Sequence, residues 1–288
     1  MNVTIKLLRP HQYLKNLFIF LPVFFAGQAL HLDLILKAFI AFIAFSAAAS
    51  AIYILNDYRD INEDRLHPRK KYRPLAAGTV SKRKAVFLMV TLFFTGSLLM
   101  LSVSLQALWV LLAYVLLNIA YSFKLKHIAI IDVCVIATGF VLRLFVGANA
   151  TLTPLSMWIV IMTFLLALFM ALAKRRDDVL IFMDTGKKMR EVVAGYNLQL
   201  IDGAMMIMSS VVIVSYILYT TSSAVVERIG SPYLYLTTIF VLLGILRYMQ
   251  ISFVEKNSGS PTRVLLNDRF IQMSVSGWLL SYVWILYL

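Results

Sequence analysis

Charged residues and cysteine are both scarce in this chain of 288 residues. Only 14% of the residues are Asp, Glu, Lys or Arg, whereas a soluble globular domain usually carries about 25%. The one cysteine, Cys134, stands in an apolar stretch, which excludes a disulfide framework and a cysteine metal cluster. Linkers, low-complexity tracts and a separate polar domain are also lacking. These absences exclude a disordered, fibrous or disulfide-stabilised protein and predict a single domain over residues 1–288.

Apolar sequence and positive charge are what the chain has in excess. Apolar residues make up 61% of it and the mean hydropathy is +0.83, which is more than a soluble core can bury. Lys and Arg number 27 against 14 Asp and Glu, for a formal net charge of +13. The composition therefore predicts a polytopic membrane protein with an unusually basic polar part.

Nine stretches are long and apolar enough to cross a bilayer, which takes roughly 20 mostly apolar residues per helix. They are residues 14–31, 34–55, 84–104, 106–122, 128–150, 155–173, 204–223, 232–250 and 268–287. Because the apolar runs are continuous rather than alternating, they favour helices over a β-barrel. We therefore expect an all-α integral membrane fold with nine transmembrane helices.

The distribution of basic residues predicts how these helices are oriented. If the N-terminus shares one side of the membrane with segments 56–83, 123–127, 174–203 and 251–267, that side holds 24 of the 27 Lys and Arg, counting those at adjoining helix ends. The opposite side then holds two. Such an excess marks the cytoplasmic side. We expect the N-terminus and the chemistry at the cytoplasmic face, and the C-terminus outside.

The first long polar segment begins with acids at a helix end. At about 100° per residue, Asn56, Asp57, Asp60 and Asp64 share one face, where like charges repel. A hard cation such as Mg²⁺ removes that repulsion and takes oxygen ligands. The pattern predicts that Asp57, Asp60 and Asp64 hold Mg²⁺ on a diphosphate. The alternative is a solvated acidic helix end held by neighbouring Arg and Lys.

A basic stretch follows these acids directly. Its cations are Arg65, Arg69, Lys70, Lys71 and Arg73. Pro68, Pro74 and Gly78 indicate ordered turns rather than a simple basic tail. Cations beside carboxylates suit a metal-bound polyphosphate, and Arg73, between the turns, is the strongest candidate. For the lysines, a purely topological role is the alternative, because Lys and Arg also keep loops in the cytoplasm.

The second long polar segment opens with two acids after three bases: Lys174, Arg175, Arg176, Asp177 and Asp178. On a helical wheel, Lys174, Arg175 and Asp178 share one face, while Arg176 and Asp177 point away. This pattern indicates a second phosphate site, at which Asp178 assists a metal or orients a hydroxyl. The alternative is an ion pair between Lys174 and Asp178, with the other cations anchored at the membrane interface.

Arg190 and Tyr196 follow on another short helical stretch. They are expected to face the same cleft, or else to be a surface charge and a packed aromatic. The two polar segments each follow an even-numbered span, four helices apart, which suggests an internal half-repeat enclosing one site.

Two ionisable residues fall inside a predicted span, where such groups are expensive. Arg143 lies eleven residues after Asp132, roughly 16 Å along a straight helix, so the two cannot pair directly. Arg143 needs another acceptor, such as a backbone carbonyl, and we interpret it as structural. Asp132 lies near the cytoplasmic end and is expected to meet Lys126 or Arg175.

With these residues in place, the chain resembles the UbiA superfamily of intramembrane prenyltransferases over essentially its full length. The resemblance rests on nine helices and on the pattern Asn56-Asp57-x-x-Asp60-x-x-x-Asp64. It implies a helical bundle in the bacterial cytoplasmic membrane, with a cytoplasmic mouth that binds Mg²⁺ and a diphosphate. A lateral portal for a polyprenyl chain is also implied.

Within that superfamily, the chain looks like the branch of the decaprenyl-phosphate phosphoribosyltransferases. The similar segments are residues 9–16 (RPHQYLKN), 67–78 (HPRKKYRPLAAG) and 121–126 (YSFKLK). Aromatic prenyltransferases carry a second aspartate-rich motif where this chain is basic. A phosphoribosyl diphosphate donor and a polyprenyl phosphate acceptor together bring more phosphate, so they need more cations and fewer carboxylates.

The branch implies transfer of 5-phosphoribose from 5-phosphoribosyl 1-diphosphate to a decaprenyl-like polyprenyl phosphate, with release of diphosphate. The expected catalytic residues are Asp57, Asp60 and Asp178. The expected ligands of substrate phosphates are Lys15, Asn56, Arg73, Tyr121, Lys126, Lys174, Arg175, Arg190 and Tyr196.

Two rival functions stay open. One is polyprenyl transfer from a polyprenyl diphosphate to an aromatic acceptor such as 4-hydroxybenzoate. The other, less favoured, is a transporter or lipid-binding membrane protein, whose sign would be ionisable residues along the bilayer midplane. No nucleic-acid partner is expected, and a homo-oligomer is compatible with the sequence.

Overall fold

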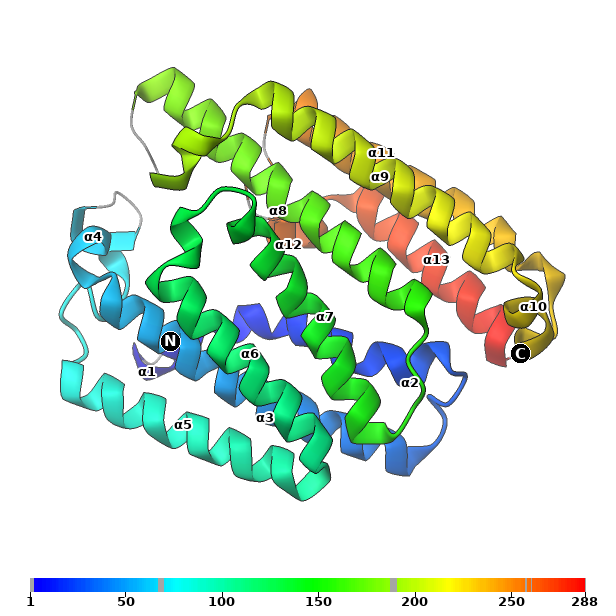
Figure 1. The fold of residues 1–288 in the computed structure, drawn as a ribbon, viewed down its shortest axis with the longest axis horizontal. Coiled ribbons are helices and arrows are strands. Elements are labelled where there is room, and N and C mark those ends of the chain that lie inside the picture. Colours follow the sequence, from blue (N-terminus) through cyan, green and yellow to red (C-terminus); the bar gives the residue numbers. More distant parts are fainter. Residues whose placement is uncertain (1–2, 67–69, 187–190, 257, 260, 288) are drawn as a thin grey trace. The chain divides into compact units, whose positions relative to one another are not determined.

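A computed structural model describes residues 3–66, 70–186, 191–256, 258–259 and 261–287. Within these residues every regular element is a helix, as the continuous apolar runs predict (Figure 1). The chain separates into two compact units: unit 1 is Met1–Phe123 with Gly139–Leu155, and unit 2 is Lys124–Thr138 with Ser156–Leu288. Helix α7 (Ile131–Thr151) therefore begins in unit 2 and ends in unit 1. A single domain over the whole chain stays a prediction.

Seven helices of the described residues are long and apolar enough to cross a membrane. They are α3 (Leu32–Arg59), α5 (Lys82–Val103), α6 (Leu105–Phe123), α7, α8 (Met157–Thr185), α9 (Leu198–Thr221) and the stretch Pro232–Phe253. They match seven of the nine predicted spans and make this a multi-pass membrane protein. The ninth predicted span coincides with α13 (Arg269–Tyr287). The count of nine crossings stays a prediction.

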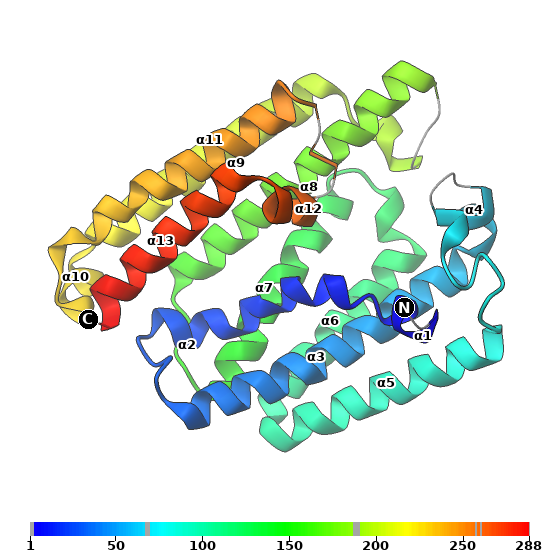
Figure 2. The ribbon, with the colours of Figure 1, turned by 180° about the vertical axis from the view of Figure 1, so that it is seen from behind.

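The first predicted span is built differently from the rest of unit 1. After α1 (Val3–Leu8), residues Pro10–Phe20 form a 3₁₀ helix, η1, which is followed by the short helix α2 (Leu21–Phe25). A continuous α-helix over 14–31 was therefore the wrong expectation. Pro22 contributes to this difference, because proline has no N–H with which to continue a helical ladder. Helix η1 packs along α3 (Figure 2).

Helix α3 forms the centre of unit 1 and packs against α5 and α6 (Figure 2). Its contact face is rich in small residues, and Ala41, Ala44 and Ala48 are completely buried. On α5, Gly96 comes so close to α3 that a Cβ atom there would lie 2.7 Å from the Ala44 carbonyl oxygen. Small residues that allow backbones to approach closely are typical of helix packing in membranes.

The connection between α3 and α5 is ordered where it is described. It contains α4 (Ile61–Leu66) and the 3₁₀ turn η2 (Lys70–Tyr72). The amide of Ala77 then donates to the Arg73 carbonyl at 2.8 Å, and Gly78 takes a left-handed φ of 71°. Ser81 caps α5 by accepting a hydrogen bond from the Lys84 amide. The ordered turns predicted from Pro74 and Gly78 are confirmed, whereas Pro68, on which the prediction also rested, lies outside the described residues.

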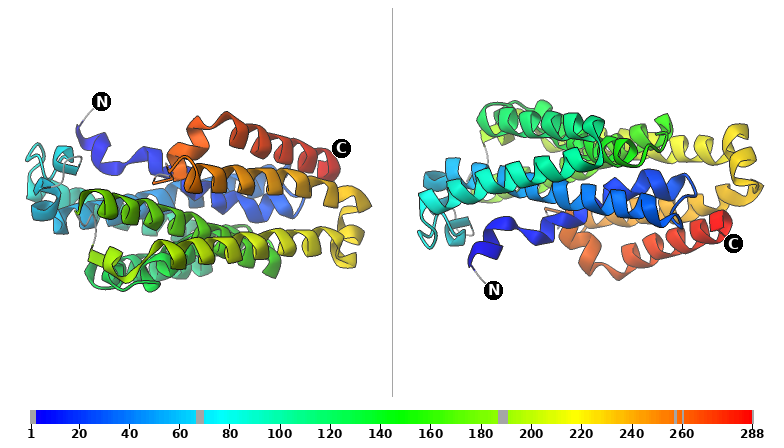
Figure 3. Two further views of the ribbon diagram at one scale, coloured as in Figure 1. Left: turned by 90° about the horizontal axis from the view of Figure 1, so that it is seen from above. Right: turned by 90° about the horizontal axis from the view of Figure 1, so that it is seen from below.

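Unit 2 is organised around the pair α8 and α9. Its other elements are η3 (Leu125–His127), η4 (Glu191–Gly195), α10 (Ser223–Ile229), η5 (Pro232–Thr237), α11 (Thr238–Phe253), α12 (Pro261–Asn267) and α13. The core between them contains Phe169, Ile201, Met205 and Tyr248. Helices α11 and α13 lie side by side, in orange and red in Figure 3.

Candidate active site

The acidic motif of unit 1 straddles a break between two helices. Helix α3 ends at Arg59, Asp60 takes the capping position with φ −87° and ψ 13°, and α4 begins at Ile61. The continuous helix expected through Asp64 is thus interrupted. The Asp64 amide nevertheless donates to the Asp60 carbonyl at 2.8 Å, so the chain keeps a helix-like turn across the break.

Asp57 and Asp64 converge on one guanidinium. The Nη1 atom of Arg73 lies 3.0 Å from Asp57 Oδ1 and 2.7 Å from Asp64 Oδ2. Both acids are 2% exposed, so they are not solvated as the alternative expected, although they are held by Arg and Lys as it expected. Arg9 is a second cation on Asp57, and Lys70 Nζ lies 3.9 Å from Asp64 Oδ1. We call Arg9, Asp57, Asp64 and Arg73 the first acidic cluster.

The basic members of this cluster explain how its acids can be buried. A carboxylate without a partner is costly to bury, and here the charges of Asp57 and Asp64 are compensated by Arg9 and Arg73. The acids are enclosed, whereas the arginine side chains remain 20% and 25% exposed. The cluster thus presents cations to an incoming anion with the carboxylates directly behind them.

Arg9 contacts Asp57 but was not among the predicted site residues. It stands between α1 and η1 with a left-handed φ of 51°, and this turn brings it to an acid 48 residues further along the chain. The only signal was its place before Pro10 in the segment 9–16. Loss of water and the charges of Arg9 and Lys15 lower the pKa of His11, as expected in a positively charged surrounding.

Three more predicted phosphate ligands belong to unit 1. Lys15 lies on η1, Asn56 at the end of α3 and Tyr121 at the end of α6. All three are half-buried. Their side chains make no hydrogen bond or ion pair in the part of the chain that the structure describes. Their proposed role as ligands stays a prediction.

Arg143 is held by neutral partners. Its Nε donates to the side-chain oxygen of Asn16 at 2.9 Å and its Nη1 donates to the Gly139 carbonyl at 2.5 Å. The guanidinium also lies 4.9 Å from the ring centroid of Phe45 and 5.1 Å from that of Tyr114, within the range of cation–π attraction. The expected backbone acceptor is confirmed, and these contacts agree with a structural role.

The second polar motif of unit 2 centres on Arg175. Its Nε donates to Asp132 Oδ2 at 2.6 Å and its Nη1 donates to Asp178 Oδ2 at 2.7 Å. The predicted meeting of Asp132 with Arg175 is confirmed. Tyr196 donates to the other oxygen of Asp132 at 2.6 Å and accepts from the Ile130 amide at 2.7 Å. We call Asp132, Arg175, Asp178 and Tyr196 the Asp132 cluster.

The two residues between Arg175 and Asp178 face elsewhere, as the helical wheel predicts. Arg176 donates to Asp202 at 2.7 Å and to the Ser252 carbonyl at 2.6 Å. Asp177 accepts a hydrogen bond from the Ser258 hydroxyl at 2.8 Å. These contacts join α8 to α9, to α11 and to the segment after α11, so Arg176 and Asp177 serve the packing of unit 2.

The remaining predicted ligands of substrate phosphates are Lys126, Lys174 and Arg190. Lys126, on η3, and Lys174, on α8, are half-buried. Arg190 lies outside the described residues.

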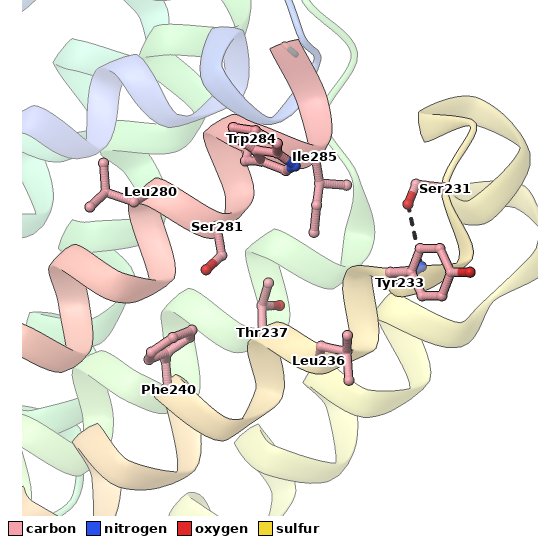
Figure 4. A pocket seen from close by; sticks show the side chains of 9 residues that line it. All are labelled: Ser231, Tyr233, Leu236, Thr237, Phe240, Leu280, Ser281, Trp284 and Ile285. Carbon is pink, nitrogen blue, oxygen red and sulfur yellow. Dashed lines mark hydrogen bonds between the residues drawn. The ribbon is translucent and has the colours of Figure 1, made fainter.

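A cavity of about 620 Å³ in unit 2 lies apart from these motifs. Ser281 and Ile285 of α13 point toward Thr237 across it (Figure 4). None of the nine residues that line it is charged, so its chemistry does not suit a phosphate. None of the predicted site residues lines it.

Comparisons with known proteins now identify the family. The profile of the UbiA prenyltransferase family matches residues 16–274. The chain belongs to this family. The decaprenyl-phosphate phosphoribosyltransferase of Mycolicibacterium smegmatis is 30% identical over 285 residues, which cover 96% of this chain and 89% of that protein. The protein of the same name from Mycobacterium tuberculosis is 31% identical, covering 96% and 91%.

A solved structure confirms the UbiA fold. A UbiA homologue from Archaeoglobus fulgidus, bound to GPP and Mg²⁺, superposes with a TM-score of 0.71 at 18% identity and covers 100% of both chains. Together with the family match, this makes the chain a membrane transferase of the UbiA superfamily.

The acids of this UbiA chain fit a magnesium ion only if the substrate completes its shell. Among the described residues, no three His, Cys, Asp or Glu side chains form a ready-made metal cage. Magnesium typically takes one or two protein carboxylates, and substrate phosphates and water supply its other ligands. Asp57 and Asp64, which share one nitrogen of Arg73, offer that number of oxygen donors close together.

Proposed function

We propose that this protein transfers 5-phosphoribose from 5-phosphoribosyl 1-diphosphate to a polyprenyl phosphate such as decaprenyl phosphate. The reaction takes place at the cytoplasmic face of a bacterial inner membrane, which the chain crosses nine times. The observation that carries the proposal is the first acidic cluster, in which Arg73 bridges two buried carboxylates. Full-length similarity to proteins named decaprenyl-phosphate phosphoribosyltransferase supports the choice of substrates.

The cluster can exchange its cations when substrate binds. Asp57, Asp60 and Asp64 would hold Mg²⁺, which when bound neutralises the leaving diphosphate. Arg73 would then turn from the two carboxylates to diphosphate oxygens, for which its planar guanidinium is well suited. Its side chain is 25% exposed, so this movement requires no opening of the core.

The transfer itself is a substitution at the anomeric carbon. An oxygen of the polyprenyl phosphate attacks C1 of the ribose, and the bond between C1 and the diphosphate oxygen breaks with its electron pair leaving on diphosphate. The attacking phosphate is already an anion near neutral pH, so no strong general base is needed. Much of the rate then comes from positioning the reactants and from stabilising the leaving charge.

The remaining polar residues are proposed to position the substrates. Asp178 would orient the ribose. The proposed ligands of the phosphate groups are Lys15, Asn56, Arg73, Tyr121, Lys126, Lys174 and Arg190. Arg175 and Tyr196 both bind Asp132, and Arg175 also binds Asp178, so they are not among these ligands.

The proposal is tested by incubating purified protein with Mg²⁺, phosphoribosyl diphosphate and a polyprenyl phosphate and searching for the glycolipid by mass spectrometry. We expect a product that disappears with EDTA and with Asp60→Ala. Asp184→Ala removes an exposed acid near the end of α8 and should leave the product in place. Activity that survives EDTA and the change at Asp60 contradicts the metal assignment. Consumption of a labelled prenyl diphosphate with 4-hydroxybenzoate, and no glycolipid, favours the aromatic prenyltransferase instead.

A further inference from the structure

Asp132 is a completely buried acid of unit 2 that binds Arg175 of the second polar motif. It lies in the first turn of α7 with an exposed fraction of 0%. Arg175 of α8 binds one of its carboxylate oxygens and Tyr196 binds the other, each at 2.6 Å. Asp132 therefore ties the start of α7 to two other parts of the chain, which are 43 and 64 residues away from it in sequence.

Arg175 is placed to hold acids rather than a substrate. It is 1% exposed, and its Nε and Nη1 atoms point to Asp132 and Asp178. A guanidinium fork that engages two carboxylates has a fixed orientation, because its nitrogens lie in one plane. Of this trio, only Asp178 reaches the surface, with a side chain that is 14% exposed.

Tyr196 completes the arrangement from the other side. Its hydroxyl donates its proton to Asp132 and accepts the Ile130 amide hydrogen. Burial and the hydrogen bond to Asp132 raise the pKa of Tyr196, so it remains protonated and donating. Ile130 has a φ of 71°, which is a strained conformation for a β-branched residue. Such strain persists only where the surroundings over-determine it.

We propose that Asp132 is a positioning residue which, through Arg175, fixes the carboxylate of Asp178 toward the substrate. Arg175 and Tyr196 then serve Asp178 instead of binding a substrate phosphate. This inference rests on the role of Asp178 in the proposed function. It deepens that role, because a carboxylate held in one orientation can accept a hydrogen bond from a ribose hydroxyl in one geometry only.

The test avoids the most direct variant. Asp132→Asn leaves the buried Arg175 with less compensating charge, which can unfold the unit. Tyr196→Phe removes the hydrogen bonds of its hydroxyl to Asp132 and from the Ile130 amide, and keeps the charges of Asp132 and Arg175. We would measure kcat and KM for phosphoribosyl diphosphate in the wild type, Tyr196→Phe, Asp178→Asn and the double variant, which together form a thermodynamic cycle.

The proposal predicts a kcat effect that depends on Asp178. Tyr196→Phe should lower kcat about tenfold and change KM by less than about twofold, as expected when orientation in the transition state is lost. With Asn at position 178, the same change should alter kcat by less than about twofold, because the carboxylate it acts through is gone. Losses that multiply in the double variant overturn the proposal, and so does a raised KM with an unchanged kcat.

A matched tyrosine separates positioning from general packing. Tyr216 on α9 is also buried, and its hydroxyl bonds Thr237 and Trp278 at 2.6 and 2.7 Å. Tyr216→Phe should leave kcat within about twofold of the wild type, because its hydroxyl bonds Thr237 and Trp278 and no member of the Asp132 cluster. An equal loss of kcat in Tyr216→Phe and Tyr196→Phe would mean that any buried hydroxyl of this unit matters, and the proposal would be wrong.

A binding measurement decides the matter without turnover. Calorimetric titration with inorganic diphosphate and Mg²⁺ should give Arg175→Gln an affinity within about twofold of the wild type, whereas Lys174→Gln weakens it at least about fivefold. Equal weakening by both changes would make Arg175 a direct phosphate ligand and overturn the proposal. If the wild type transfers a prenyl group instead of phosphoribose, the proposed function is wrong. The role of Asp132 can still be decided then, by the titration and by the same thermodynamic cycle measured on prenyl transfer. If Arg175→Gln does not fold, the cycle decides.

Discussion

Arg143 donates its Nε hydrogen to the side-chain oxygen of Asn16 at 2.9 Å, although 127 positions separate them in the chain. The amide nitrogen of Asn16 in turn donates to the Ser46 hydroxyl at 2.8 Å. One buried asparagine thus connects η1, α3 and α7 within unit 1. The positive charge of Arg143 is accommodated by neutral oxygens and aromatic rings.

This contact predicts that Asn16→Ala destabilises the protein. The change leaves the Nε hydrogen of Arg143 without its acceptor in a side chain that is 4% exposed, which costs about 1–3 kcal/mol. Thermal unfolding in detergent measures the loss. Asn149→Ala is the control, because Asn149, on α7 like Arg143, only donates to the Phe145 carbonyl in an exposed position. Equal losses for both variants contradict the prediction.

Two glycines should respond to alanine with opposite signs. At Gly147 a Cβ atom would lie 2.0 Å from the Ile19 carbonyl oxygen, so Gly147→Ala must push η1 away from α7. Overpacking of this kind costs about 1–3 kcal/mol. At Gly203, inside α9, a Cβ atom meets nothing within 4 Å, and Gly203→Ala should stabilise by about 0.5–1 kcal/mol. Unfolding midpoints of the two variants on either side of the wild type are the expected result.

Arg73→Gln should reveal the exchange of cations at the first acidic cluster. Arg73 occupies oxygens of Asp57 and Asp64 that a metal would need, so its removal should tighten binding of Mn²⁺ alone by about tenfold. With diphosphate present the order reverses, because the variant lacks a charge-assisted contact to phosphate. Electron paramagnetic resonance of free Mn²⁺ follows both titrations. Arg73→Lys keeps the charge and should lie closer to the wild type.

One result of the Mn²⁺ titrations would contradict the proposed exchange at Arg73. If Arg73→Gln weakens Mn²⁺ binding both with and without diphosphate, the arginine holds the acids in place for the metal, and the proposed exchange of partners is wrong.

Arg176→Met should affect stability and spare catalysis. Arg176 binds Asp202 and the Ser252 carbonyl, and its loss leaves a carbonyl without this donor at a cost of about 1–3 kcal/mol. The folded fraction should retain the wild-type kcat, because Arg176 faces away from Asp178. Activity is therefore normalised to folded protein by size-exclusion chromatography. A fall in kcat of the folded fraction would place Arg176 in the site.

Much of the architecture follows from local sequence. Apolar runs of about 20 residues predict helices, and seven of the nine predicted runs correspond to helices that can cross a membrane. The prediction of an α-helix for the first run was wrong, because the periodicity and length of the run do not distinguish a 3₁₀ helix from an α-helix. The helical wheel placed Arg175 and Asp178 together and turned Arg176 away, which the structure confirms, since three or four residues along one helix already determine a face.

The partners of buried charges could not be predicted in the same way. The wheel brought Asp57 and Asp64 to one side but said nothing of Arg9, which binds Asp57 together with Arg73. The sequence did suggest Arg175 for Asp132, because both stand near the cytoplasmic ends of predicted spans. It did not suggest that Tyr196 takes the second oxygen of Asp132.

The sequence by itself determined that this is a helical membrane protein with an acidic motif beside basic ones, because composition, apolar run length and helical periodicity are properties of neighbouring residues. Only the tertiary structure decided which cation meets which acid. Arg9 reaches Asp57 over 48 positions and Tyr196 reaches Asp132 over 64. Such contacts form when helices far apart in the chain pack together and no water remains to solvate a buried charge, so each carboxylate takes the donor that packing brings to it.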